Sequence, residues 1–144
     1  MKSFYEAKRQ VTSSAYNTTV LYDTPTLFNT NSEIELNDVF DQYDELKIYM
    51  GLNDNGIYEQ IKAITIPKDI LLQSYHDYND PTITQSEKGR FPINNHVYAC
   101  NDYIMCWQLV AKDYDVLLCA FKDAKNWNSN ICYIYKIVGV KYHA

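Results

Sequence analysis

Short apolar segments that alternate with polar residues recur along most of the chain. In the clearest one, Leu46, Ile48 and Met50 are separated by Lys47 and Tyr49. A period of two is the pattern of a β-strand with one buried face. Further strands are expected at residues 20–22, 33–36, 57–66, 70–72, 97–100, 104–111, 116–121 and 131–140. The pattern predicts an all-β chain, an antiparallel β-sandwich (jelly-roll-like) of about eight or nine short strands.

Turn residues separate these segments. Asn53 to Gly56 form a hairpin signal between two strands. The apolar positions change phase between Ala63 and Ile64, which indicates a bulge or bend. Residues 38–43 are expected to form a single helical turn.

The last segment is apolar on both faces. One face carries Ile131, Tyr133, Tyr135 and Ile137, and the other carries Ile134, Val138 and Val140. A strand of this kind lies at the centre of a sandwich or against a neighbouring subunit. Both alternatives stay open, and the candidate subunit-interface residues are Tyr133, Tyr135 and Ile137.

The first 17 residues differ from the rest in charge. They hold three basic residues and one acidic residue, a net charge of +2. Because the whole chain has a net charge of −5, residues 18–144 have a net charge of −7. We therefore predict an N-terminal arm or anchor at residues 1–17 and a β-sandwich domain at residues 18–144. The arm could dock onto an acidic partner. The alternative is a solvated terminus.

Three aromatic residues lie in polar surroundings that suit recognition. Residues 73–96 are polar and are expected to have little regular structure, which is uncommon in a small domain and often functional. Tyr75 and Tyr78 lie in this stretch, and Trp127 stands among asparagines between two strands. These three residues are the candidate ligand or partner contacts. The alternative for Trp127 is a ring that covers one end of the core.

Composition excludes several classes of protein. Hydrophobic residues make up 47% of the chain, which argues against disorder, and no basic stripe indicates nucleic-acid binding. The longest apolar run, residues 116–121, is too short for membrane insertion. The N-terminus has no secretory signal, so we expect synthesis in a cytoplasm. The four cysteines match no zinc spacing and are expected to be buried thiols, or to include one disulfide.

Catalytic patterns are absent from the sequence. There is no G-x-S-x-G, no H-E-x-x-H and no phosphate-binding glycine loop, and the chain has 4 glycines. His76 with Asp77 and Asp80 fits turn chemistry better than half of a catalytic or metal site. We therefore expect no enzyme, no cofactor and no metal site.

Two segments together resemble a known family. The first runs from Val20 through Ile34-Glu35-Leu36-Asn37-Asp38 to Phe40-Asp41-Gln42-Tyr43-Asp44-Glu45-Leu46-Lys47-Ile48-Tyr49, and the second is Ile131-Cys132-Tyr133-Ile134-Tyr135-Lys136-Ile137-Val138-Gly139-Val140-Lys141. The pattern is similar to the small C-terminal β domain of bacteriophage tail-fibre and head-fibre (virion fibre) proteins. The chain departs from it at Val140, where an aromatic residue often stands, and in its long insertion at residues 73–96.

The resemblance implies a location and partners. A domain of this kind would be part of the virion after synthesis in the host bacterial cytoplasm. It would form a homo-oligomer, with a trimer favoured, and would contact other virion proteins. Because the family domain caps a long shaft and this one follows a short leader, a fibre or capsid-decoration subunit is the expected role. The alternative is a host-attachment adhesin that binds surface carbohydrate through the loop aromatic residues.

Overall fold

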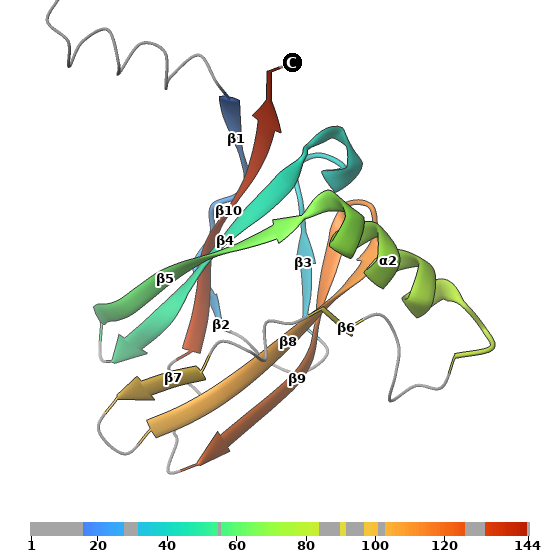
Figure 1. Cartoon of the computed structure of the whole chain (residues 1–144). Helices are drawn as coiled ribbons and strands as arrows, with labels where there is room; N and C mark the ends of the chain where they lie inside the picture. The colour runs from blue at the N-terminus through green and yellow to red at the C-terminus, as the bar shows by residue number, and fades with distance from the viewer. Residues whose placement is uncertain are drawn as a thin grey trace, which may run out of the picture.

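The computed structural model describes residues 16–27, 32–54, 56–83, 90–91, 97–100, 103–125 and 132–143. Within these residues the chain forms two antiparallel five-stranded sheets that pack together (Figure 1). The predicted β-sandwich is therefore confirmed. The described residues also form one α-helix and one 3-10 turn.

The two sheets draw on different parts of the chain. Sheet A has the order β1 (Tyr16–Tyr22), β10 (Cys132–Tyr142), β4 (Glu45–Asp54), β5 (Ile57–Pro67), with β2 (Thr26–Leu27) also paired to β10. Sheet B has the order β3 (Glu33–Glu35), β9 (Val116–Lys125), β8 (Tyr103–Asp113), β6 (Arg90–Phe91), with β7 (Val97–Cys100) also paired to β8. In sheet A the consecutive strands β4 and β5 pair, and in sheet B β8 pairs with both β7 and β9. The first and last long strands, β1 and β10, are neighbours.

The β4–β5 hairpin forms where its turn residues predict it. Gly56 has a φ of +85°, a backbone conformation that glycine adopts at little cost. The expected bulge is present but lies nearer the turn, where the register shifts between Met50 and Leu52. Ile64 and Ile66 consequently face the core, whereas Ile61 is exposed.

The core lies between the sheets and is built from alternate strand residues. Sheet A contributes Leu46 and Ile48, and sheet B contributes Leu109 and Leu117, all fully buried. Burying an aliphatic side chain of this size stabilises the fold by roughly 1.5–3 kcal/mol. The 3-10 turn η1 (Phe40–Gln42), predicted as a helical turn, adds the ring of Phe40 to the same cluster.

The final strand is central in sheet A, and a bulge decides which of its side chains face inward. The register between β10 and β4 shifts between Ile134 and Lys136. As a result Ile134 and Ile137 both face the core, although simple alternation placed them on opposite faces. Val138 pairs with Lys47 and lies on the other, outer face of the sheet.

Residues 68–79 correct one prediction. They form helix α2 (Lys68–Asn79), where a short strand and an irregular polar stretch were expected. Leu71 is fully buried, and Ser74 and Tyr75 follow at the spacing of one helical face. Pro67 precedes the helix, a position where its missing N–H costs no hydrogen bond. The helix packs mainly against β8 (Figure 1).

The two ends of the described chain meet at one corner. Tyr16 pairs with Tyr142, so the start of β1 and the end of β10 lie side by side (Figure 1). β1 begins at Tyr16, two residues before the predicted start of the β-sandwich domain at residue 18. Residues 1–15 of the predicted arm lie outside the described residues.

Candidate functional site

The outer face of sheet A exposes apolar side chains near the corner where the chain ends meet. Tyr16, Thr18 and Val20 of β1 stand opposite Tyr142, Val140 and Val138 of β10. Opposed residues of an antiparallel pair point to the same face. The side chains of Tyr16, Val20 and Tyr142 are 37%, 45% and 51% exposed, respectively. We call these three residues the corner patch.

β1 is also an edge of sheet A. It is hydrogen-bonded to β10 on one side, and no other described strand pairs with it. Near the end of β1 the carbonyl of Leu21 accepts a hydrogen bond of 2.8 Å from the Asn37 amide, which covers that part of the edge. Residues Tyr16–Val20 are all exposed and none carries a charge. The open part of this edge is thus the segment Tyr16–Val20.

The strand that supports this edge is held by Asp44 and Glu45. The amide of Tyr142 donates to the Asp44 carboxylate at 2.6 Å, and the amide of Asp44 donates to the carbonyl of Val140 at 2.8 Å. The hydroxyl of Tyr142 hydrogen-bonds to the carboxylate of Glu45, which raises the pKa of Tyr142. These contacts fix the end of β10, so β1 lies on a rigid support.

Tyr43 packs beneath the same support. A Cβ atom added to Gly139 would lie 2.6 Å from the Tyr43 ring, so only glycine fits there without movement. The Tyr43 hydroxyl donates to Asp38 at 3.1 Å. Burial raises the pKa of Tyr43, and Asp38 raises it further, although the hydrogen bond with Thr19 lowers it. The two segments that carry the sequence resemblance are thus in direct contact here.

The predicted subunit-interface residues separate into two groups. Ile137 is fully buried in the core, so it has no exposed surface for a second subunit, and we reassign it to the core. Tyr133 and Tyr135 are half-buried, and their rings stack with centroids 6.2 Å apart. Next to them Lys136 places its Nζ 4.9 Å from the centre of the Tyr49 ring. These side chains extend the outer face away from the corner patch.

Two of the predicted recognition residues, Tyr75 and Tyr78, lie three residues apart on α2. Tyr75 lies on α2, with its ring stacked on Tyr114 at 4.4 Å between centroids, and it packs against the core. Tyr78 is half-buried on the same helix. Trp127 lies outside the described residues. Helical spacing of Leu71, Ser74, Tyr75 and Tyr78 is the signal that would have identified the helix in the sequence.

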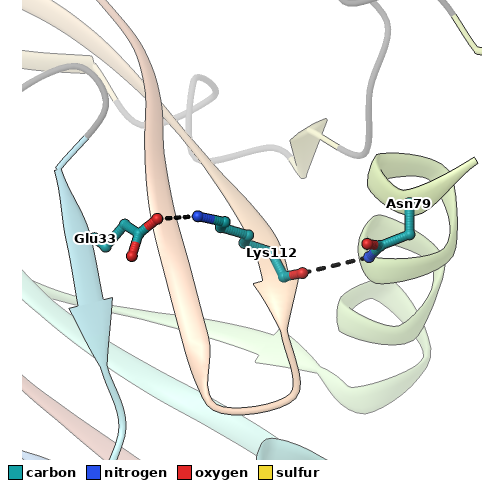
Figure 2. Close-up of polar contacts among 3 residues, drawn as sticks. All are labelled: Glu33, Asn79 and Lys112. Atoms are coloured by element: carbon teal, nitrogen blue, oxygen red, sulfur yellow. Dashed lines mark hydrogen bonds and ion pairs between the residues drawn. The ribbon is translucent and has the colours of Figure 1, made fainter. Parts of the chain in front are cut away.

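One edge segment of β8 is covered by a helix, in contrast to the open edge of β1. At the end of β8 beyond β6, the amide of Ala111 donates to the buried hydroxyl of Ser74 at 3.0 Å. The side chain of Asn79 donates to the carbonyl of Lys112 at 3.3 Å, and Lys112 forms an ion pair with Glu33 of β3 (Figure 2). Side chains of α2 thus satisfy backbone groups of β8 that have no strand partner.

Among the described residues, no group of three or more His, Cys, Asp or Glu side chains could hold a metal ion. Cys119 is a buried thiol outside any disulfide, as predicted for this cysteine. The described part of the chain has no helix long and apolar enough to cross a membrane. No protein-family model matches the chain, and no curated protein sequence matches it.

Proposed function

We propose that this chain is a structural subunit of a bacteriophage particle, of the fibre or capsid-decoration type, whose role is binding rather than catalysis. The proposal combines the sequence resemblance with the β-sandwich fold. A fold alone is weak evidence for function. The stronger support comes from the way the two ends of the sandwich differ.

One observation carries the proposal. The N-terminal residues 1–15 lead directly into β1, at the corner formed by Tyr16 and Tyr142. β10 begins at the opposite end of sheet A, where Cys132 pairs with Leu52 close to the β4–β5 turn (Figure 1). A subunit held through its N-terminal segment would therefore present the turns at the other end. This polarity suits a component that is anchored at one end and displayed at the other.

The basic N-terminal segment supplies the anchor in this proposal. Residues 1–15 contain Lys2, Lys8 and Arg9 and one acidic residue, whereas the chain as a whole has a net charge of −5. An acidic surface on a neighbouring virion protein would attract this segment and repel the acidic sandwich. The segment would thus both attach and orient the subunit.

Deletion of residues 1–15 tests the anchor. Because β1 begins at Tyr16, this deletion leaves the sandwich complete, and the circular dichroism spectrum is expected to remain that of the full chain. Purified particles from the source strain are expected to contain the full chain and to lack the truncated one, as measured by mass spectrometry. A matched control keeps the length of the segment and replaces Lys8 and Arg9 with Gln, which tests the charge alone. Normal incorporation of the truncated chain would refute the anchoring role.

The adhesin alternative now depends on Trp127. Tyr75 is stacked on Tyr114, so its replacement by Ala would disturb the packing of α2 as well as any ligand. Trp127→Ala is the cleaner variant. Loss of host binding by particles that still contain the protein would support the adhesin, whereas unchanged host binding would leave the structural role.

A further inference from the structure

The segment Tyr16–Val20 is an edge that can accept another strand. Its five residues are exposed and uncharged, and Thr18, Thr19 and Val20 are β-branched residues that favour extended backbone. Backbone N–H and C=O groups along an unpaired edge are a template for pairing with another chain. Natural proteins usually protect such edges with charge, proline, short strands or a covering element.

The described edges at β8, β3 and β5 carry such protection. α2 covers the end of β8 through Ser74 and Asn79. β3 has three residues, and its exposed Glu33 and Glu35 flank the buried Ile34. β5 carries the exposed Lys62 and ends at Pro67. Among the strands that the structure describes, β1 is the long edge without these features, which marks it as an interaction site.

We propose that β1 binds a second copy of this chain by antiparallel strand pairing about a twofold axis at Thr18. The open segment Tyr16–Val20, here called the window, decides the register. It ends at Val20 because the carbonyl of the next residue, Leu21, already accepts a hydrogen bond from the Asn37 amide. Thr18 is the middle residue of that window. Two identical strands that pair antiparallel about it form a closed, isologous interface.

This register covers the exposed apolar residues of β1. Tyr16 of each copy stands opposite Val20 of the other, on the outer face of sheet A. The two Thr18 side chains meet at the axis. Aromatic and β-branched residues opposite each other are a stabilising cross-strand pair. Tyr16 is 37% exposed and Val20 is 45% exposed in the single chain. The pairing therefore buries two side chains whose exposure the fold of one chain leaves unexplained.

Charge also favours this site over the rest of the surface. Each chain has a net charge of −5, so two copies repel each other over most approaches. The window Tyr16–Val20 brings no charged residue opposite another. The pairing joins the two copies of sheet A into one continuous sheet.

The proposal does not depend on a role in the virion, and it differs from the trimer that the sequence resemblance implies. Twofold pairing through β1 gives a dimer. The absolute mass of the full-length chain, measured by size-exclusion chromatography with light scattering across a dilution series, is expected to reach twice 16.9 kDa. A mass of one chain at every concentration, or a mass of three chains, would overturn the proposal.

Thr18→Lys tests the site. Two lysines opposite each other at the axis repel, so the variant is expected to have the mass of one chain and the circular dichroism spectrum of the folded wild type. The matched control is Thr65→Lys, an exposed threonine of β5 on the same outer face, which is expected to remain a dimer. A Thr18→Lys variant that keeps the dimer mass would show that the interface lies elsewhere.

Thr18→Cys tests the register. Opposed residues of an antiparallel pair have Cα atoms about 4.5–5.5 Å apart, within the range of a disulfide. Mild oxidation is expected to give a covalent dimer for Thr18→Cys, and the wild-type chain and Thr65→Cys are expected to give none. Equal cross-linking of the two variants would contradict a twofold axis at Thr18.

Discussion

The edges of β8 and β1 differ in whether another part of the chain covers their backbone groups. At the end of β8, Ser74 accepts the Ala111 amide and Asn79 donates to the Lys112 carbonyl, so α2 covers the edge. At β1, the described residues place no element beside Tyr16–Val20, and the cover stops at the Leu21 carbonyl. The fold covers the edge of β8 and leaves the edge of β1 open, and the open edge is where we propose that a second copy of the chain binds.

The strand beside the open edge of β1 is held firmly in place. β10, the neighbour of β1, is fixed by Asp44, by Glu45 and by the ring of Tyr43 on Gly139. A rigid strand with an open side is preorganised for pairing, because little conformational entropy remains to be lost on binding. The contrast thus predicts which substitutions change stability and which change only association.

The largest loss of stability is expected for Gly139→Ala. The added Cβ meets the Tyr43 ring at 2.6 Å, and overpacking of this kind costs about 1–3 kcal/mol of unfolding free energy. Urea unfolding followed by circular dichroism measures the loss. Gly56→Ala is the control, since no atom lies within 4 Å of its added Cβ and its cost comes from the positive φ alone, up to about 1 kcal/mol. Equal losses in the two variants would contradict the close packing beneath β1.

Ser74→Ala is expected to open the covered edge. It leaves the buried Ala111 amide without the hydroxyl that accepts its hydrogen bond, which costs about 1–3 kcal/mol. The control is Thr65→Ala on exposed β5, which is expected to change the unfolding free energy by less than about 0.5 kcal/mol. If Ser74→Ala is as stable as wild type, the helix does not protect this edge through that bond.

Alkaline pH is expected to weaken the support beneath β1. The pKa of Tyr43 is raised in the folded chain by burial, so its contribution is complete below the unfolded value of 10.0 and is lost as pH rises above it. Tyr43→Phe has no proton to lose at this position. The difference in urea midpoint between wild type and Tyr43→Phe is therefore expected to shrink between pH 8 and pH 11. A constant difference would contradict the raised pKa.

The smallest effect is expected at Lys112. Its ion pair with Glu33 lies on the surface, where such pairs contribute little because water and salt screen them. Lys112→Gln is expected to leave the thermal midpoint within about 2 °C of wild type. A large drop would show that the charge pair, rather than the side chains of α2, secures the β8 edge.

Strands were the part of the fold that the sequence predicted best. Alternation at Leu46, Ile48 and Met50 and the turn at Gly56 are local signals, and both appear in the structure where expected. The sequence does not predict the helix clearly, because Tyr75 and Tyr78 stand among polar residues that are typical of a loop. The spacing from Leu71 to Tyr78 carried the helical period, but the surrounding polar residues obscured it.

The candidate site was harder to predict. Ile137 was assigned to a subunit interface because strict alternation placed it beside Tyr133 and Tyr135, and a one-residue bulge reverses that assignment. The open edge at Tyr16–Val20 depends on strand order, since β1 pairs with the last strand of the chain. No local pattern reveals which strand will lie at the edge of a sheet. The segment also falls across the predicted end of the arm, so it was divided between two units.

Amide hydrogen exchange across a concentration series tests the central contrast most directly. The account predicts that the Ala111 amide is protected at every concentration, because its partner is Ser74 of the same chain. Those amides of Tyr16–Val20 that face away from β10 are expected to exchange rapidly in dilute solution and slowly in concentrated solution, when a second β1 covers them. Exchange at Tyr16–Val20 that is unchanged by concentration would contradict the account.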